Sequence, residues 1–336
     1  MSLKIKKISP ESAEFNRFYN FPKGIYPEDS PKWKVPEDID FKNLIAVYLV
    51  EDENNLLARA ALYQNPNLNF QNQPTFCIGN YEAKNHPKAA QILIDQVSED
   101  AKKLGAKFLL GPMNGSTWGT YRFAESTNSP FFLEPHYLNY YQKHFLNAGF
   151  KSIRNYNSKL VEEIPTDSLE PENELIELQK SLKVNVRPIN MTDFAGDLKK
   201  LHELVHQAFA HNFLFTPLKK EEFVNKYMIT ADFLNQEYTR IAEDEDGNFL
   251  AFFFCLDDHL NPAEKRLIIK TIARHPDSKW RGLGQLMGSL LYRKAKKDGY
   301  QSIIHALMDE DANSSSISTK FAGKPINRYF LYAKEL

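Results

Sequence analysis

The chain has 336 residues, a formal net charge of −1 at pH 7 and 42% hydrophobic residues. This length accommodates about two domains of ~150 residues each, and the near-neutral charge argues against the strongly basic surface of a nucleic-acid-binding protein. The sequence has no apolar run of the ~18 residues that a membrane-spanning helix needs, and its N-terminal residues resemble no signal peptide. Cys77 and Cys255 lie in apolar runs, which predicts buried thiols rather than a disulfide. We therefore expect a soluble, cytoplasmic protein that binds neither nucleic acid nor membranes.

Residue patterns in the first half of the chain predict a mixed α/β domain. Apolar residues alternate with period two in several short runs and recur at helical spacing in two longer ones. Residues 111–135 follow neither pattern, which predicts a long irregular loop. The predicted strands are 3–8, 44–51, 56–63, 76–81 and 108–110, and the predicted helices are 87–104 and 137–148.

The second half begins after a polar segment, 164–174, which contains Pro165 and Pro171 and indicates a domain boundary. Asp246-Gly247 is a strong signal for a β-hairpin turn. Helices are predicted at 175–182, 193–210, 219–227 and 311–321, and strands at 184–188, 238–243, 249–257, 267–273, 302–304 and 327–333.

The stretch from Leu267 to Ile304 is the most informative part of the sequence. A strand rich in isoleucine is followed by a glycine-containing loop, a helix that ends at Gly299, and a second strand. The start of a helix leaves backbone N–H groups without partners and carries a partial positive charge. Glycine lets a phosphate approach such a backbone closely, so the loop Lys279–Gly284 predicts an anion-binding site, to which Arg281 adds a positive charge.

The two halves also show an internal repeat. The sequence AKKLGAKFLL at 101–110 matches AKKDGYQSII at 295–304, and the dipeptide His86-Pro87 matches His275-Pro276. The second copy has extra residues between these two landmarks, and the glycine-containing loop lies there. We therefore expect two copies of one fold, of which only the second keeps the loop.

The loop and its flanking elements resemble the acyl-CoA-binding region of the GNAT acetyltransferases, whose pyrophosphate loop reads [QR]-x-x-G-x-[GA]. Lys279 stands at the first position of this motif in place of Gln or Arg, and Gly282 and Gly284 stand at the other two. The resemblance implies an α/β (α+β) fold of two GNAT-like domains, each a mixed, mostly antiparallel sheet flanked by helices. It implies a degenerate domain at 1–165, a linker with a short helix at 166–183, and an acetyltransferase domain at 184–336.

The resemblance also implies roles for individual residues. The strand backbone near Ile272 and Ala273 would pair with the pantetheine arm, and Asn313 would face the CoA. A tyrosine often acts as the acid in this family, but Thr319 stands at that position, so the catalytic acid and base are not assigned. The pyrophosphate would be held by the loop and the first turn of the helix, formed by Lys279, Arg281, Gly282, Leu283, Gly284 and Gln285.

These observations predict an acyl-CoA-dependent N-acyltransferase that transfers an acetyl group from acetyl-CoA to a small-molecule or peptide amine. One alternative is an aminoacyl transferase that takes amino acids from charged tRNA, although the near-zero net charge argues against tRNA binding. A second alternative is a non-catalytic acyl-CoA-binding protein.

Other residue patterns have both functional and structural interpretations. His202 to His206 spells HExxH, a zinc-protease motif, but the sequence lacks the usual third ligand, and we expect no bound metal. His305 lies inside a predicted strand, which favours a buried histidine over a catalytic base. The acidic run 309–311, the loop residues Trp118, Tyr121 and Arg122, and the segment 213–217 are secondary candidates for a binding site.

Overall fold

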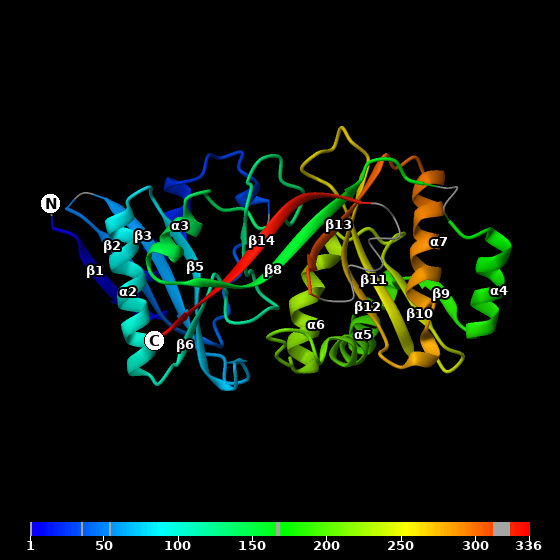
Figure 1. Ribbon diagram of the computed structural model, residues 1–336, viewed down its shortest axis with the longest axis horizontal. Helices are drawn as coiled ribbons and strands as arrows, with labels where there is room; N and C mark the ends of the chain where they lie inside the picture. Colours follow the sequence, from blue (N-terminus) through cyan, green and yellow to red (C-terminus); the bar gives the residue numbers. More distant parts are fainter. Residues whose placement is uncertain (1, 35, 54, 166–168, 312–322) are drawn as a thin grey trace. The chain divides into compact units, whose positions relative to one another are not determined.

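The computed structural model describes residues 2–34, 36–53, 55–165, 169–311 and 323–336 (Figure 1). The chain forms two compact units. Unit 1 comprises Met1–Asn155, Phe213–Thr216 and Arg328–Leu336, and unit 2 comprises Tyr156–Asn212 and Pro217–Asn327. The units thus differ from the consecutive ranges expected from the sequence, because the C-terminal residues lie in unit 1 and the region expected as a linker contributes a helix to unit 2.

Unit 1 contains a mixed sheet in which β5 and β6 are parallel and the other ordered pairs are antiparallel. Two short strands, β4 (Asn69–Phe70) and β7 (Phe123–Ala124), pair with β5 and β14. The strand order is β1 (Lys4–Ile8), β2 (Leu44–Glu51), β3 (Leu56–Tyr63), β5 (Gln73–Ala83), β6 (Phe108–Gly111) and β14 (Lys324–Glu335), whose residues from Arg328 onward belong to unit 1.

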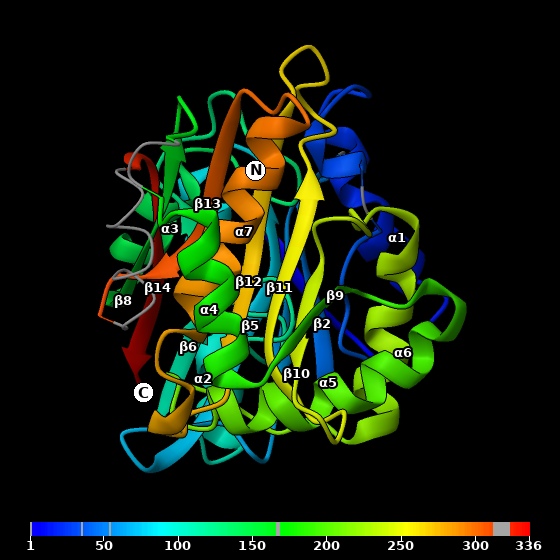
Figure 2. The same ribbon diagram turned by 90° about the vertical axis from the view of Figure 1, so that its right-hand side faces the viewer.

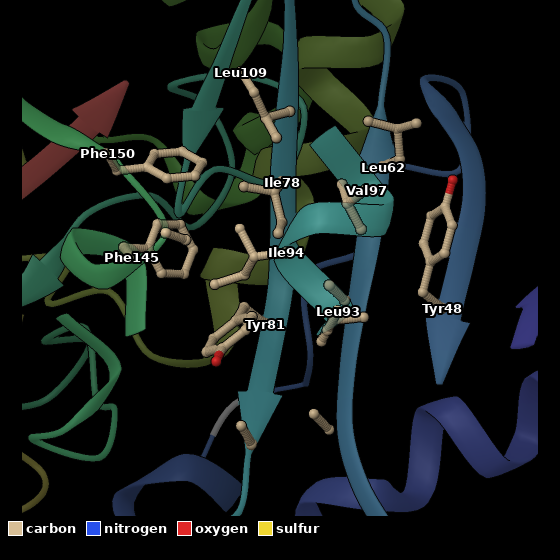
Figure 3. Packing of buried hydrophobic residues seen from close by; sticks show 14 of the residues in the cluster. Tyr48, Leu62, Ile78, Tyr81, Leu93, Ile94, Val97, Leu109, Phe145 and Phe150 are labelled. Atoms are coloured by element: carbon tan, nitrogen blue, oxygen red, sulfur yellow. The ribbon is translucent and has the colours of Figure 1, made fainter. Parts of the chain in front are cut away.

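One face of this sheet is apolar and packs against α2 (Pro87–Lys103) and α3 (Tyr141–Asn147). Figure 3 shows Leu93, Ile94 and Val97 of α2 among the buried side chains of β5 and β6. This burial follows from the helical spacing of the apolar residues of α2, which places them on one side of the helix. The segment before β2 contains α1 (Phe15–Asn20) and two short 3-10 helices, η1 (Phe21–Gly24) and η2 (Pro31–Trp33).

Unit 2 contains a second mixed sheet, with β12 and β13 as its parallel pair. The other neighbouring strands are antiparallel. The strand order is β8 (Lys151–Val161), whose residues from Tyr156 onward belong to unit 2, then β13 (Ser302–Asp309), β12 (Arg266–Arg274), β11 (Phe249–Asp257), β10 (Arg240–Glu243) and β9 (Asn185–Pro188).

Helices lie on both faces of the sheet of unit 2 (Figure 1). The helices α5 (Phe194–Phe209) and α6 (Lys220–Met228) contact each other and cover one face, and α7 (Leu283–Lys297) covers the other. Figure 2 shows α4 (Glu172–Leu182) packed along the outer side of α7. Short 3-10 helices precede α5 (η3, Met191–Asp193), follow α6 (η4, Ile229–Asp232) and precede α7 (η5, Ser278–Trp280).

Most of the predicted elements are present, and β2, β3 and β11 have the predicted bounds. The strand β8 was not predicted, because its sequence KSIRNYNSKLV is largely polar and gives little apolar alternation. The helix α3 begins at Tyr141 rather than Tyr137. The helix predicted at 311–321 lies almost entirely outside the described residues. In the part of the chain that the structure describes, no helix has the length and apolar composition needed to cross a bilayer.

Candidate functional site

The parallel pair of unit 2 separates part-way along its length. The ladder between β12 and β13 ends at Ile269 and His305, although β12 continues to Arg274 and β13 to Asp309. We call these continuations, residues 270–274 and 306–309, the fork of unit 2. Ile272 and Ala273, the residues predicted to pair with pantetheine, lie in this fork. On the side of β12 that faces β11, they pair with Phe253 and Phe252.

A bulge in β13 separates the two strands. The register of β13 with β8 shifts between His305 and Met308, and Leu307 adopts a left-handed φ of 58°. The backbone N–H of Leu307 donates to the side-chain hydroxyl of Ser158 on β8 at 2.9 Å. Because a bulge bends its strand, β13 turns away from β12 at this point.

The helix α7 lies between β12 and β13 in the sequence. Its first turn is not capped by a side chain among the described residues. Gly282 is the N-cap and adopts a φ of 94°, a conformation that side chains other than glycine rarely tolerate. The first helical bond runs from the Leu286 N–H to the Gly282 carbonyl at 2.9 Å. The N–H groups of residues 283–285 therefore precede the helical ladder, as the start of a helix requires. The helix starts at Leu283, so that Gly284 lies buried within the first turn rather than before it.

The two charged side chains of the loop, Lys279 and Arg281, differ in their surroundings. Arg281 is exposed, and Lys279 lies 3.9 Å from the Asp277 carboxylate and 4.9 Å from the centre of the Trp280 ring. The Gln285 side chain donates to the Glu170 carboxylate, which also accepts from Ser289 of α7. An anion at this helix start would therefore contact the backbone of residues 283–285 and not the amide side chain of Gln285. Asn313 and Thr319 lie outside the described residues.

Unit 1 contains the equivalent parallel pair, β5 and β6. We call the part of β5 beyond this pair, residues 78–83, the fork of unit 1, and other segments of the chain pack against it. The β5–β6 ladder ends at Cys77 and Leu110, and β5 continues to Ala83. A side chain at Gly79 would collide with the backbone of Met113, which shows how closely the following segment packs there. Four hydrogen bonds satisfy the edge of β5: Met113 N–H to Ile78 O (3.0 Å), Asn80 N–H to Asn114 Oδ1 (2.8 Å), Ala83 N–H to Tyr141 Oη (3.0 Å) and Tyr140 Oη–H to Ala83 O (2.9 Å).

The helix that follows β5 is also closed to an anion. The side chain of His86 is the N-cap of α2 and accepts from the Ala89 N–H at 3.1 Å. Pro87, the first residue of the helix, has no N–H to donate. Within the residues described, the edge of β5 in unit 1 is therefore paired by the chain, and the helix after it is capped by a side chain.

The fold of this chain is similar to that of solved structures. A GCN5-related N-acetyltransferase from Sphaerobacter thermophilus superposes with a TM-score of 0.54, at 13% identity, over 98% of this chain and 95% of that chain. A tandem GNAT protein from the clavulanic acid biosynthesis pathway superposes with a TM-score of 0.55, at 10% identity, over 99% of this chain and 98% of that one. This chain has a tandem GNAT fold.

A further GNAT-like structure comes from Enterococcus faecalis V583 and is named as a probable N-acyltransferase. Its TM-score is 0.60 at 10% identity, and the match covers all of this chain and 73% of that one. Neither a protein-family model nor a curated protein matches the sequence. The similarity therefore rests on the fold, as expected when sequences have diverged to about a tenth identity.

The two histidines of the HExxH motif bind backbone groups. His202 Nε2 donates to the Leu218 carbonyl at 2.8 Å, and His206 Nδ1 donates to the His202 carbonyl at 2.7 Å. The Leu218 N–H donates to His206 Nε2 at 3.0 Å. Within the described residues, no cluster of three or more His, Cys, Asp or Glu side chains could hold a metal ion. The motif thus joins α5 to the loop before α6.

His305 lies in the core of unit 2, and only 4% of its surface is exposed. Its Nε2 is 2.6 Å from the hydroxyl of Tyr292 on α7. Burial, with a smaller contribution from the charge of Lys159, lowers the pKa of His305 from 6.5 to about 4. The imidazole is therefore neutral at pH 7 and has the contacts of a packed core residue rather than of an exposed base.

Among the remaining sequence candidates, Trp118, Tyr121 and Arg122 have packing contacts inside unit 1. The Trp118 indole N–H donates to the Thr216 carbonyl at 2.6 Å, and the Trp118 ring lies 5.7 Å from that of Phe215. Arg122 stacks on Tyr121 at 3.9 Å. These contacts hold Phe213–Thr216 within unit 1. The acidic residues 309–311 lie at the end of β13, where Asp309 accepts from the Asp311 N–H at 3.1 Å.

Proposed function

We propose that the chain is an acyl-CoA-dependent N-acyltransferase that uses acetyl-CoA as the acyl donor, and that unit 2 binds this donor. The observation that carries the proposal is the difference between the units. The fork of unit 2 is followed by a helix that starts at an uncapped glycine, whereas the fork of unit 1 is filled and its helix is capped. The GNAT fold supports the same assignment, because acyltransferases with this fold use these two features to bind acyl-CoA.

In this proposal the donor makes two sets of contacts. The N–H groups of Leu283, Gly284 and Gln285, together with Gly282, bind the pyrophosphate, and Lys279 and Arg281 add positive charge nearby. Ile272 and Ala273 pair with the pantetheine arm through the backbone, as a strand would. Asn313 is proposed to contact the CoA from the helix predicted after β13. The contacts of the pyrophosphate are mainly with the backbone, which explains how Lys279 can replace the usual Gln or Arg.

The proposed reaction is direct transfer to an amine. The nitrogen of the neutral amine attacks the thioester carbonyl, the carbon–sulfur bond breaks, and the CoA thiolate leaves. A backbone N–H at the fork stabilises the oxyanion, and a base acting through water accepts the proton of the amine. The acceptor is proposed to be a small-molecule or peptide amine, and the net charge of −1 does not favour a nucleic acid.

The test is acetyl-CoA binding by the intact chain, measured by calorimetry. Arg281→Glu places a negative charge beside the proposed pyrophosphate, so we expect a loss of about 2–3 kcal/mol, roughly 30- to 150-fold in affinity. Lys88→Glu is the matched control, because Lys88 is an exposed cation in the first turn of α2. The control should bind like the parent, and equal binding by Arg281→Glu would sink the proposal.

A second variant, Gly284→Glu, tests the backbone contacts directly. A carboxylate in the first turn of a helix is compatible with the helix dipole, but it would occupy the space of the pyrophosphate. Gly284 is buried, so circular dichroism must first show that the variant is folded. Turnover of acetyl-CoA with a panel of amines then separates an enzyme from a protein that only binds acyl-CoA. Turnover with charged tRNA alone would favour the aminoacyl-transferase alternative.

A further inference from the structure

The face of the unit 1 sheet opposite α2 buries charged side chains. Glu82 lies on β5 with 1% of its surface exposed, and its cross-strand neighbour on β3 is Arg59, which is fully buried. Arg59 forms an ion pair with Glu37 and donates to the Phe18 carbonyl at 2.6 Å. Because burying a charge is costly unless it is paired, such a cluster inside a small domain indicates a specific role for these groups.

Around Glu82 the structure forms a cage that holds an ammonium group. The Nζ of Lys32 lies 2.5 Å from Glu82 Oε1, and it lies 5.6 Å and 5.3 Å from the ring centres of Tyr26 and Tyr137. The hydroxyls of Tyr26 and Tyr141 donate to Glu82 Oε2 at 2.7 and 2.9 Å. A carboxylate and two aromatic faces are the groups that recognise an organic cation.

The cage offers one acceptor beyond those that Lys32 is shown to use. Glu82 Oε1 is buried, and the Lys32 ammonium at 2.5 Å satisfies it. His136, whose ring centre is 5.9 Å from that of Tyr26, has a buried Nδ1 that lacks a hydrogen-bond partner within the described chain. Burial, with a contribution from the charge of Lys32, lowers the pKa of His136, so this ring is neutral and one of its nitrogens accepts hydrogen bonds.

Lys32 enters the cage from a short segment that its own neighbours hold in place. Ser30 Oγ caps η2 by accepting from the Lys32 N–H at 3.2 Å, and the Trp33 indole donates to the Pro27 carbonyl at 2.7 Å. The Lys32 side chain remains 19% exposed, whereas Glu82 is almost fully buried. The ammonium can therefore leave toward solvent by rotation of one long side chain, while the backbone of η2 stays in place.

We propose that this cage, formed by Glu82, Tyr26, Tyr137, Tyr141 and His136, is a binding site for a primary alkylammonium group, and that Lys32 is its intramolecular occupant. The ligand is primary rather than quaternary, because the buried acceptor atoms of Glu82 and His136 require N–H donors. An external ammonium has to displace Lys32, so its apparent affinity is its intrinsic affinity multiplied by the fraction of molecules in which Lys32 lies outside the cage. All residues of the cage lie in unit 1, and this inference therefore does not depend on the proposed acyl-CoA site.

The test compares the intact parent chain with Lys32→Ala by calorimetric titration. The ligands are n-butylammonium and Nα-acetyl-lysine methylamide, with tetramethylammonium as a cation that has no N–H group. We expect Lys32→Ala to bind one primary ammonium at least about tenfold more tightly than the parent, and to bind tetramethylammonium far less well. Stronger binding of the lysine derivative would identify a lysyl side chain as the source, and equal binding would identify a free amine.

Lys32→Ala combined with Glu82→Gln is the matched control, and it should lose the binding that Lys32→Ala gains. Equal affinity in the parent and in Lys32→Ala, or no binding by a folded Lys32→Ala, would overturn the proposal. If Lys32→Ala is unfolded, recovery of the native circular dichroism signal with n-butylammonium supports the site, and failure to recover overturns it. Acetyl-CoA binding should be unchanged in these variants, so that failure here is distinguishable from failure of the proposed function.

Discussion

The two units share a parallel strand pair followed by a helix, and they differ in what lies beyond the end of that pair. In unit 1, Asn114 accepts the Asn80 N–H and Tyr141 accepts the Ala83 N–H, so the strand edge is already satisfied by the chain. In unit 2 the ladder ends at Ile269, and β13 turns away at a bulge beside Leu307. The comparison shows that the two related sheets persist with different groups beyond the end of the parallel pair, because backbone polar groups need partners but any donor or acceptor can supply them.

The units also differ in one cross-strand pair of residues. This pair joins β3 to β5 in unit 1 and β11 to β12 in unit 2. In unit 1 the pair is Arg59 and Glu82, and in unit 2 the pair is Phe254 and Thr271. Thr271 follows Glu82 by the offset that aligns the two His-Pro dipeptides. At this matched position, therefore, unit 1 has a buried charged pair and unit 2 has an uncharged pair.

The largest expected effect on stability comes from Arg59→Met, which removes the buried guanidinium and keeps similar volume. Glu37 loses its ion-pair partner and the Phe18 carbonyl loses its donor, so we expect a loss of about 3 kcal/mol in the free energy of unfolding. Urea denaturation of the intact chain measures the change. Thr271→Val at the matching position of unit 2 should change stability by less than about 1 kcal/mol. Similar losses in both variants would remove the contrast between the polar and apolar pairs.

The next-largest expected effect is on the pH dependence of stability, and it comes from a buried histidine that each unit contains. Both bury a histidine against a tyrosine hydroxyl, Tyr81 with His144 at 2.7 Å and Tyr292 with His305 at 2.6 Å. Burial lowers the pKa of His305 from 6.5 to about 4, so the unfolded chain binds a proton in this range that the folded chain does not. Stability from this group is therefore complete above about pH 6.5 and decreases as the pH falls toward 4, by about 2 kcal/mol between pH 7 and pH 5.

Denaturation of His305→Gln at a series of pH values checks this expectation, because glutamine keeps a hydrogen-bonding side chain and does not titrate. The slope of stability against pH should become shallower in the variant by up to about 1.4 kcal/mol per pH unit. An unchanged slope would mean that His305 titrates equally in the folded and unfolded chain. His144 should contribute in the same direction in unit 1, since burial lowers its pKa to about 4 as well.

The smallest effect is expected from Asn114→Ala, which reopens part of the fork of unit 1. The Asn80 N–H loses its acceptor and the Asp38 carbonyl loses a donor at 2.7 Å, so we expect a loss of about 1–2 kcal/mol in the free energy of unfolding. The stoichiometry of acetyl-CoA should stay at one per chain by calorimetry, because α2 remains capped by His86. A second bound acetyl-CoA would show that the filled strand edge alone had excluded the ligand from unit 1.

Local sequence determined much of the fold. The period of the apolar residues predicted α2, β2, β3 and β11 with nearly the observed bounds, since helix and strand place side chains with different periods. The loop Lys279–Gly284 predicted a helix directly after it, and the structure begins α7 slightly earlier, at Leu283, with Gly282 as a left-handed N-cap that favours a residue without a side chain. The repeat of strand, His-Pro and helix predicted two related units, and the superposition on a tandem GNAT protein confirms the tandem fold.

Only the tertiary structure decided which groups meet across long distances in the chain. β8, from the first half, pairs with β13 in unit 2, while β14, the last strand, completes the sheet of unit 1. The contact of Lys32 with Glu82 and that of Asn114 with Asn80 each join residues that lie far apart in the sequence. No periodic pattern in the sequence links the two residues of either pair. Periodicity reports which face of an element is apolar, but it carries no information on which distant donor satisfies a given buried acceptor. That choice depends on how the chain packs as a whole.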